Sequence, residues 1–371
     1  MLIALGIILT IIALFFTDYV SMGRVPHGKR LERCQASPNY NKTGFTNLEP
    51  TILITDNAKR KGIKSVLWSF IFSSKNGLKP KTPLESYPVN REEIEKAVRQ
   101  GQDKVIWFGH SSYLLIIGGK TILVDPVFYH GSPISFINRP FKGTSNFRIH
   151  DLPFIDFLVY THDHYDHLDY KAAKKLKHKS GMTIVPLGVG SHLEYWGFKP
   201  EKVVELDWGE SYSQALDSHI PNHMEGTDSQ EVERFTFNCT PARHFSGRSF
   251  KMNRTLWASF VLQTPSKCIY IGGDGGYGKH FKEIGQKYSI DWAFIENGQY
   301  NKRWAYIHTL PDQLHCVMED LGARHYVTVH HSKFSLSQHK WDEPLGNELK
   351  AAEQSGKSLT VLQIGNPTDL K

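Results

Sequence analysis

The chain has 371 residues and a formal net charge of +7 at pH 7. Its 40% hydrophobic and 22% charged content excludes a disordered chain and leaves room for one large domain or two ordinary ones. The basic balance favours anionic partners. The four cysteines are scattered with no C-x-x-C spacing, so the sequence indicates neither a cysteine zinc site nor a disulfide framework.

The first predicted element is a hydrophobic segment at residues 1–23. Residues 2–16 are unbroken apolar, about 22 Å long as a helix, and residues 17–20 make the segment just long enough to cross a bilayer. No Lys or Arg precedes the segment, and Arg24, Lys29, Arg30 and Arg33 follow it. This pattern favours an uncleaved membrane anchor with the rest of the chain on the cytoplasmic side. A cleaved signal peptide and an ordinary buried helix are the alternatives.

Residues 24–100 are predicted to form a turn-rich extension that packs on a larger domain at residues 101–371. From residue 104 the pattern changes to short runs rich in β-branched and aromatic residues. These runs predict strands at residues 105–108, 113–117, 121–124, 156–160, 183–186, 235–240, 257–262, 268–271, 292–295, 326–329 and 359–362. Helices are predicted at residues 170–178 and 311–321. Two sets of strands with interspersed helices indicate the α/β class, as an αββα sandwich of two packed sheets.

The strongest motif is H-x-H-x-D-H, which begins directly after the predicted strand at residues 156–160. It places His162, His164, Asp166 and His167 within six residues. Imidazole nitrogens and carboxylate oxygens are zinc ligands, and a catalytic ion needs about three of them from the protein. Four ligands on one regular strand or helix cannot all reach a single ion, whereas a loop can divide them between two ions.

Three further candidate ligands lie where a predicted strand has just ended, which is where loops present functional groups. They are His244, Asp274 and His330. Each is weak alone, but with the first motif and in this order they predict a two-metal site. The segment at residues 273–278 also fits the nucleotide pattern G-x-G-x-x-G. That interpretation would place Asp274 against a pyrophosphate, and no clear helix follows, so the metal interpretation is favoured.

The order H-x-H-x-D-H, then His, Asp and His, resembles the metallo-β-lactamase superfamily. The sequences THDHYDHLDY at 161–170, WFGHS at 107–111, TPARH at 240–244 and GDGGY at 273–277 look like those of the N-acyl-phosphatidylethanolamine-hydrolysing phospholipase D family. The resemblance covers about residues 100–345. It implies a metallo-β-lactamase fold for a catalytic domain at residues 101–371, and the predicted N-terminal membrane anchor lies outside the resemblance.

The resemblance also implies two Zn²⁺ ions per chain and a role for each matching residue. His162, His164 and His244 would bind one ion, Asp166, His167 and His330 the other, and Asp274 would bridge them. His330 rather than His331 matches the ligand position. Asp125 and His110 would support the ligands from behind. Catalytic roles fall to Asp166, Asp274 and His308, and substrate contacts to Arg248, Tyr165 and His308.

The implied activity is zinc-dependent hydrolysis of N-acyl-phosphatidylethanolamine, or a similar phospholipid, to N-acylethanolamine and phosphatidic acid by a metal-bridging hydroxide. The expected partners are a phospholipid substrate and a membrane surface, and a homodimer is left open. Nucleic acid is not expected, because no aromatic-basic stacking pattern accompanies the charge. The alternatives are a metal-dependent lactonase or phosphodiesterase acting on a phosphorylated small molecule, and a membrane-anchored metal-binding scaffold without activity.

Overall fold

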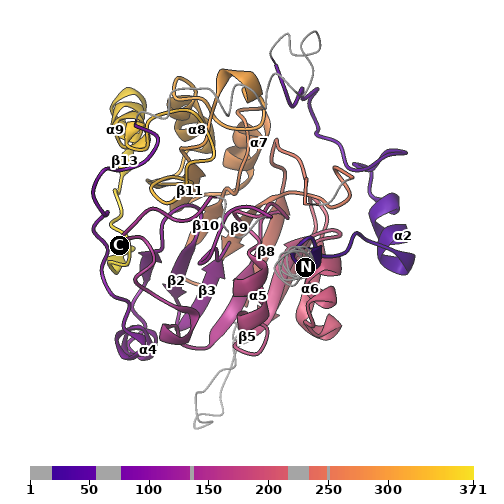
Figure 1. Cartoon of the computed structure of the whole chain (residues 1–371), viewed down its shortest axis with the longest axis horizontal. Helices are drawn as coiled ribbons and strands as arrows, with labels where there is room; N and C mark the ends of the chain where they lie inside the picture. Colours follow the sequence, from indigo (N-terminus) through magenta and orange to yellow (C-terminus); the bar gives the residue numbers. More distant parts are fainter. Residues whose placement is uncertain (1–18, 56–76, 134–137, 216–233, 249–250) are drawn as a thin grey trace, which may run out of the picture.

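The computed structural model describes residues 19–55, 77–133, 138–215, 234–248 and 251–371. Two seven-stranded sheets face each other, with helices on both outer sides (Figure 1). Aromatic side chains join the sheets: the Tyr113 ring stacks on Phe294 at 4.4 Å between centroids, and the Phe157 ring lies 5.0 Å from that of Phe237. The predicted αββα sandwich is confirmed.

The first sheet is antiparallel at one edge and parallel from β3 to β6. Its order is β14 (Thr368–Asp369), β1 (Lys104–Trp107), β2 (Tyr113–Ile117), β3 (Lys120–Val124), β4 (Ile155–Val159), β5 (Ser180–Pro186) and β6 (Val203–Leu206). The predicted turn between β2 and β3 contains Gly118 and Gly119, both with positive φ. Glycine adopts this backbone without the steric cost that other residues meet.

The second sheet has a similar division into antiparallel and parallel parts. Its order is β13 (Ser358–Leu359), β12 (His325–Val329), β11 (Trp292–Glu296), β10 (Cys268–Ile271), β9 (Ser259–Gln263), β8 (Arg234–Thr240) and β7 (Ser211–Ala215). The strands from β10 to β13 are parallel. The strand predicted at residues 359–362 is shorter than expected, because the chain leaves the second sheet and Ile364 bridges to Trp107 of the first.

Helices cover the outer faces of both sheets (Figure 1). On the first sheet they are α4 (Arg91–Arg99), α5 (Tyr170–Leu176) and α6 (Gly190–Tyr195), and on the second α7 (His280–Lys287), α8 (Leu314–Leu321) and α9 (Glu343–Ser355). Helix α7 follows the glycine-rich segment, so the expectation that no helix follows it is wrong. Its apolar face, with Phe281 and Ile284, packs into the cluster under the second sheet. That burial stabilises a helix whose N-cap, Lys279, makes no side-chain capping bond.

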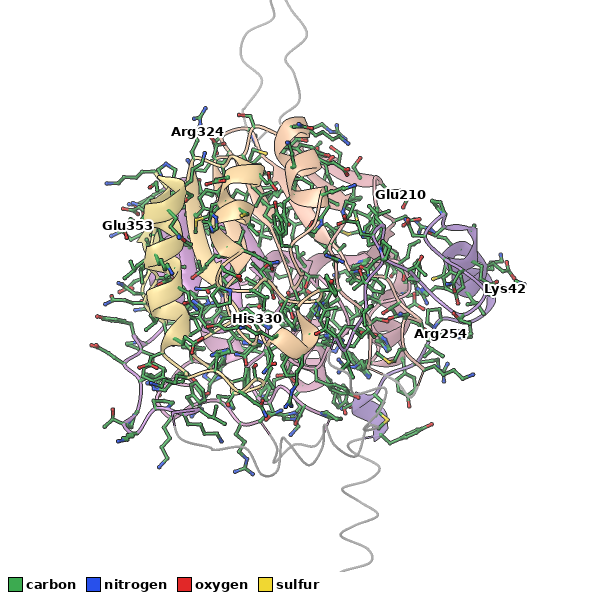
Figure 2. The ribbon with its side chains drawn as sticks, turned by 90° about the horizontal axis from the view of Figure 1, so that it is seen from above. Lys42, Glu210, Arg254, Arg324, His330 and Glu353 are labelled. Atoms are coloured by element: carbon green, nitrogen blue, oxygen red, sulfur yellow. The ribbon has the colours of Figure 1, made fainter. Side chains whose placement is uncertain are left out.

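The topology brings the functional loops to one place. Strands β3 and β4 of the first sheet are parallel, as are β10, β11 and β12 of the second. Carboxyl ends of parallel strands meet at one edge of a sheet, and loops leave from there. Strand β12 runs from the periphery, marked by Arg324, to His330 nearer the middle of the molecule (Figure 2).

No helix in the described part of the chain is long and apolar enough to span a membrane. This finding overturns the predicted membrane-associated localisation with the catalytic domain on the cytoplasmic side. The anchor prediction rested on residues 2–20, of which the structure describes Tyr19 and Val20; residues 1–18 lie outside the described ranges.

The first described residues dock on α6. Trp196 Nε1 donates to the carbonyl of Val20 at 2.9 Å, and the backbone N–H of Arg24 donates to His192 Nδ1 at 3.1 Å. Helix α2 (Gly28–Ala36) adds the Arg30 guanidinium, which pairs with Glu194 and Glu205. The start of the extension is therefore fixed to the first sheet and its helix by hydrogen bonds and partly buried ion pairs.

Gly23 is the tightest point of this docking, and we expect Gly23→Ala to loosen it. Its φ is +69°, and a Cβ there would lie 2.2 Å from His192 Nδ1. We expect a loss of about 2–4 kcal/mol in the free energy of unfolding, from backbone strain plus the clash. Gly28→Ala is the matched control, because Gly28 has φ +53° with nothing within 4 Å of its Cβ position. It should lose only about 1 kcal/mol in urea denaturation. Equal losses in the two variants would show that the contact with His192 contributes nothing.

Candidate metal centre

The first ligand group contains His162, His164, His244 and Asp274, and its ligand atoms all lie within 4.8 Å of one another. His164 Nδ1 is 3.1 Å from His244 Nε2, and Asp274 Oδ2 is 3.8 Å from the Nε2 atoms of His162 and His244. Ligands 2.0–2.1 Å from a tetrahedral zinc ion lie about 3.3 Å apart. The group therefore has the size of a four-ligand site for a single ion.

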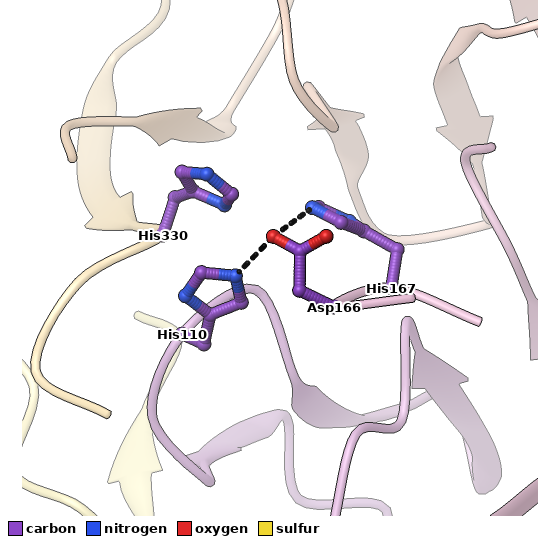
Figure 3. Close-up of side chains that lie close together, drawn as sticks. All are labelled: His110, Asp166, His167 and His330. Carbon is purple, nitrogen blue, oxygen red and sulfur yellow. Dashed lines mark hydrogen bonds and ion pairs between the residues drawn. The ribbon is translucent and has the colours of Figure 1, made fainter. Parts of the chain in front are cut away.

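The second group lies beside the first and contains His110, Asp166, His167 and His330 (Figure 3). Asp274 reaches it with its other oxygen: Oδ1 is 3.1 Å from His167 Nε2 and 3.0 Å from His330 Nδ1. Asp166 Oδ2 is 3.8 Å from His167 Nε2. One carboxylate thus offers one oxygen to each group, which is the arrangement of a bridging ligand.

Buried polar atoms without good hydrogen bonds indicate whether these residues could bind a metal ion. Within the described ranges, His162 Nε2, His167 Nε2 and Asp274 Oδ1 are buried and make no hydrogen bond of good geometry, although the last two atoms lie 3.1 Å apart as an ion pair. A buried polar atom without a partner costs about 1–3 kcal/mol, and more if it is charged. All three face the space between the ligand groups, so bound cations would satisfy them together. The donor set fits divalent metal ions.

The protonation states of three ligand histidines suit metal binding. Burial, followed by the neighbouring histidines, lowers the pKa of His162, His244 and His330 well below the ordinary value. These rings are therefore neutral at pH 7 and offer a nitrogen lone pair. The pKa of Asp274 is also lowered, because burial is outweighed by His167 and its neighbours.

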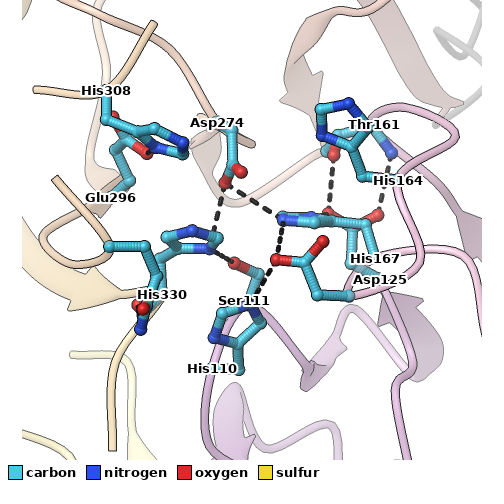
Figure 4. A network of polar contacts seen from close by, with 12 residues as sticks. His110, Ser111, Asp125, Thr161, His164, His167, Asp274, Glu296, His308 and His330 are labelled. Carbon is cyan, nitrogen blue, oxygen red and sulfur yellow. Dashed lines mark hydrogen bonds and ion pairs between the residues drawn. The ribbon is translucent and has the colours of Figure 1, made fainter. Parts of the chain in front are cut away.

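Each ligand histidine is more effective when its second ring nitrogen is held. The Asp125 carboxylate accepts from His167 Nδ1 at 2.7 Å and from both the backbone N–H and the hydroxyl of Thr161 (Figure 4). The Thr161 hydroxyl lies 3.0 Å from His162 Nδ1. His244 Nδ1 donates to the carbonyl of Ile307 at 2.7 Å. Nε2 is thereby the free ligand atom of all three rings, and Asp125 supports the ligands as expected.

His110 supports Asp166. Its Nε2 lies 2.9 Å from Asp166 Oδ2, and its ring packs 4.1 Å from that of His330. His110, Asp125 and His330 have φ values of 55°, 39° and 72°, a left-handed backbone that is uncommon for residues other than Gly, although Asn, Asp and His adopt it more often than most. Backbone bonds hold the first two: His110 N–H to the carbonyl of His331, and Asp125 N–H to that of Val159. Such locally strained residues cluster at functional sites.

The side chains of the adjacent residues His330 and His331 point in different directions. His330 faces the second ligand group, whereas His331 Nε2 lies 3.1 Å from the Thr328 hydroxyl and His331 Nδ1 lies 2.8 Å from that of Ser332. His331 therefore packs away from the ligands.

The structure does not leave Arg248 free for its predicted contact with substrate. The residue is 2% exposed, with Nε donating to the carbonyl of Ser21 at 2.9 Å and Nη1 to that of Asp163 at 2.8 Å. Nη2 is left without a hydrogen-bond partner among the described residues, but it is buried with the rest of the guanidinium, so Arg248 is not open to a substrate in this structure. Arg248 instead links the docked N-terminal segment to the metal-binding loop. Tyr165 stacks under Arg248 and donates its hydroxyl to the Arg248 carbonyl at 2.9 Å; its contact with substrate stays a prediction.

His308 lies beside both ligand groups, with its Nδ1 2.8 Å from Glu296 Oε2. Sequence reasoning missed Glu296, although it ends a strand as the ligand loops do. It also missed Ser111, whose hydroxyl is 2.9 Å from His330 Nδ1, and Thr161. Ser111 and Thr161 are each adjacent in sequence to a predicted site residue. This adjacency could have identified them.

A fully buried lysine fastens three loops of the site. Lys333 Nζ donates to the carbonyls of Phe108 and Val127, each at 2.8 Å, and lies near the rings of Phe128 and Phe147. Its loop follows His330, while Phe108 and Val127 flank the loops of His110 and Asp125. Burial lowers the pKa of Lys333 to about 7.

Lys333→Met is expected to flatten the pH dependence of stability. Between pH 7 and pH 10.5 the unfolded chain holds a proton on Lys333 that the folded chain releases, so raising the pH through this window favours the folded state. From pH 7 to pH 9 the free energy of unfolding of the wild type should rise by about 2 kcal/mol relative to the variant. Urea denaturation of the two metal-free proteins measures this difference. Lys42→Met, at an exposed lysine, is the control and should follow the wild type; identical profiles for Lys333→Met and the wild type would contradict the expectation.

The sequence of the chain matches the profile of a known protein family. The profile described as the β-lactamase superfamily domain matches residues 120–331, more than half of the chain. The chain belongs to the β-lactamase superfamily. It is thereby a metal-dependent hydrolase with the metallo-β-lactamase fold, as the resemblance implied.

Two curated relatives are similar to the chain in sequence, and one solved structure is similar to it in fold. An uncharacterized protein of Mycobacterium tuberculosis is 34% identical over 346 residues, 90% of this chain and 85% of that protein. The N-acyl-phosphatidylethanolamine-hydrolyzing phospholipase D 1 of Caenorhabditis elegans is 30% identical over 245 residues, 62% of this chain and 64% of that protein. The predicted resemblance is confirmed. Igni18, a metallo hydrolase from the archaeon Ignicoccus hospitalis, matches with a TM-score of 0.53 at 18% identity over 72% of this chain and 97% of that one, a likeness of fold.

Proposed function

We propose that this superfamily member is a dinuclear zinc phosphodiesterase that hydrolyses N-acyl-phosphatidylethanolamine, or a similar phospholipid, to an N-acylethanolamine and phosphatidic acid. The observation that carries the proposal is the Asp274 carboxylate, which offers one oxygen to each of two adjacent ligand groups. Metal ions held there would supply Lewis acidity and a coordinated water of lowered pKa.

The chain's own residues have distinct tasks in this proposal. Asp274 fixes the spacing of the two groups, and Asp166 is held toward the second group by His110. His308 lies where it can meet an oxygen of a phosphoryl group that spans both groups. Asp125 keeps His167 in its ligand tautomer.

The substrate class rests on relatives rather than on geometry. The worm relative is named for hydrolysing N-acyl-phosphatidylethanolamine, and the matched 245 residues are 30% identical. The formal charge of +7 suits a phosphorylated substrate. A lactone of a phosphorylated sugar acid would share the anionic group, so a test must offer both.

The test is turnover by the full chain loaded with Zn²⁺, with metal content measured on the same sample. We expect about two zinc ions per chain and release of N-acylethanolamine from N-acyl-phosphatidylethanolamine, and His164→Ala should lose both turnover and zinc. Full zinc content with turnover of a sugar-phosphate lactone but not of the lipid would replace the proposal with a lactonase. Less than one zinc per chain, unchanged in His164→Ala, would favour a scaffold without activity.

A further inference from the structure

The imidazole of His308 is placed over both ligand groups. Its side chain is 12% exposed, and its ring centroid is 5.1 Å from that of His244 in the first group and 5.4 Å from that of His330 in the second. Figure 4 shows the ring between Glu296 and Asp274. A substrate oxygen that contacts both groups would therefore meet this ring.

Glu296 is the last residue of β11 and is 5% exposed. Its carboxylate makes two bonds to consecutive residues: Oε2 with His308 Nδ1 at 2.8 Å, and Oε1 with the backbone N–H of Thr309 at 2.5 Å. One carboxylate thus fixes both the ring and the backbone beside it. Because Nδ1 is engaged, Nε2 is the ring nitrogen left to face the ligand groups.

The segment that carries His308 is fastened on its other sides as well. The carbonyl of Ile307 accepts from His244 Nδ1 at 2.7 Å, and the Thr309 hydroxyl donates to the carbonyl of Gly275, next to Asp274, at 2.9 Å. The position of His308 is therefore tied to a ligand of the first group and to the loop of the bridging carboxylate. A rotation of the ring remains, and Glu296 is the group that stops it.

We propose that Glu296 is the positioning residue of this site: it fixes the His308 ring with Nε2 directed at an oxygen of the anionic substrate group that spans both ligand groups. A carboxylate acceptor on Nδ1 favours a ring that also donates from Nε2. The contact is a hydrogen bond, and no bond is made or broken at either residue. Naming that substrate group a phosphodiester rests on the proposed function.

The burial of Glu296 agrees with a dedicated task. Burial raises the pKa of this carboxyl to about 7, against the pull of His308 and of the Thr309 N–H. Removing a carboxylate from water is expensive, and the cost is offset only by good partners. Glu348 is similarly buried and also has a pKa of about 7, but its partner is the Thr328 hydroxyl, on the far side of β12 from the ligands. Glu348 is therefore the matched control.

The experiment uses the zinc-loaded full chain as wild type, Glu296→Ala, Glu296→Gln, His308→Gln and Glu296→Ala/His308→Gln. Inorganic phosphate binding is measured by calorimetry, zinc by elemental analysis, and turnover with N-acyl-phosphatidylethanolamine and bis(4-nitrophenyl) phosphate. In Glu296→Ala we expect phosphate to bind about tenfold more weakly and kcat to fall about 10–100-fold, with zinc content unchanged. The double variant should be no worse than His308→Gln, because Glu296 acts through His308.

The glutamine variant separates positioning from a general structural role. Its amide oxygen can accept from His308 Nδ1 but cannot also serve Thr309, so kcat should fall only about three- to tenfold. Glu348→Gln should leave phosphate affinity and kcat at wild-type values even if it lowers Tm.

Three results would overturn the inference. Unchanged phosphate affinity in Glu296→Ala would remove the positioning role. Additive losses in the double variant would show that Glu296 acts independently of His308. Loss of zinc in Glu296→Ala or His308→Gln would make this pair metal ligands instead. If the chain cleaves bis(4-nitrophenyl) phosphate but not the lipid, only the proposed substrate is contradicted. Phosphate affinity and the comparison of the single and double variants would still test the role of Glu296.

Discussion

Asp274→Asn is expected to reduce the metal content of the proposed two-ion site to one ion or fewer per chain and kcat/KM by about 10³-fold or more. The substitution keeps the volume of the side chain but replaces one carboxylate oxygen with an amide NH2, which cannot bind a cation. Oδ1 and Oδ2 serve different ligand groups, so one group loses its shared ligand whichever way the amide turns. Loss of one metal ion removes several kcal/mol of charge stabilisation from the reaction.

Elemental analysis and steady-state kinetics on the same preparation check this prediction. Asp320→Asn is a suitable control, because Asp320 accepts from the Tyr277 hydroxyl at 2.7 Å on helix α8 and should keep both metal content and activity. A variant at position 274 that still held two ions would show that the carboxylate is not shared.

Asp125→Asn is the second substitution with a large expected effect. Asp125 has φ 39°, a backbone that asparagine tolerates better than most residues, so the loop should keep its path. The variant loses the charged acceptor of His167 Nδ1 and one of the acceptors for Thr161. We expect the affinity of the second group for metal to fall about 10–100-fold.

Competition with a chromophoric chelator measures that affinity, and Asp125→Ala separates the two causes. Alanine adds strain at a positive φ, of about 1 kcal/mol, and should therefore lower Tm further than asparagine while weakening metal binding to a similar degree. If asparagine kept wild-type affinity, the negative charge behind His167 would have no part in holding the metal.

The ligand residues could be predicted because their signal is local. A His or Asp that directly follows an apolar strand is carried to the carboxyl edge of its sheet, and the parallel strands bring several such edges together. Asp125 and Asp274 were found in this way. Glu296 obeys the same rule, but its partner lies twelve residues later, beyond a turn whose path the sequence does not specify.

The position of the Arg248 side chain, in contrast, could not be predicted from the sequence. The match of Arg248 to a position of the resembled family suggested a side chain near the substrate. Its direction is set by the carbonyls of Ser21 and Asp163, and Ser21 is 227 residues away in sequence. Docking of the N-terminal segment on α6 depends on such distant contacts, including a glycine that leaves room for His192. Pairings of this kind follow from tertiary packing, which local pattern does not encode.

The origin of the ligands has a consequence for assembly. His162, His164, Asp166 and His167 leave the first sheet after β4, whereas His244, Asp274 and His330 leave the second after β8, β10 and β12. Each ion would therefore cross-link the two halves of the sandwich, and its binding energy would oppose their separation. During synthesis the H-x-H-x-D-H loop is complete before either ion site is, because each site also needs ligands from the second half. Both metal ions can therefore bind at full affinity only after residue 330 has folded against the first half. We therefore expect loss of metal to weaken the contact between the two sheets before either sheet unfolds.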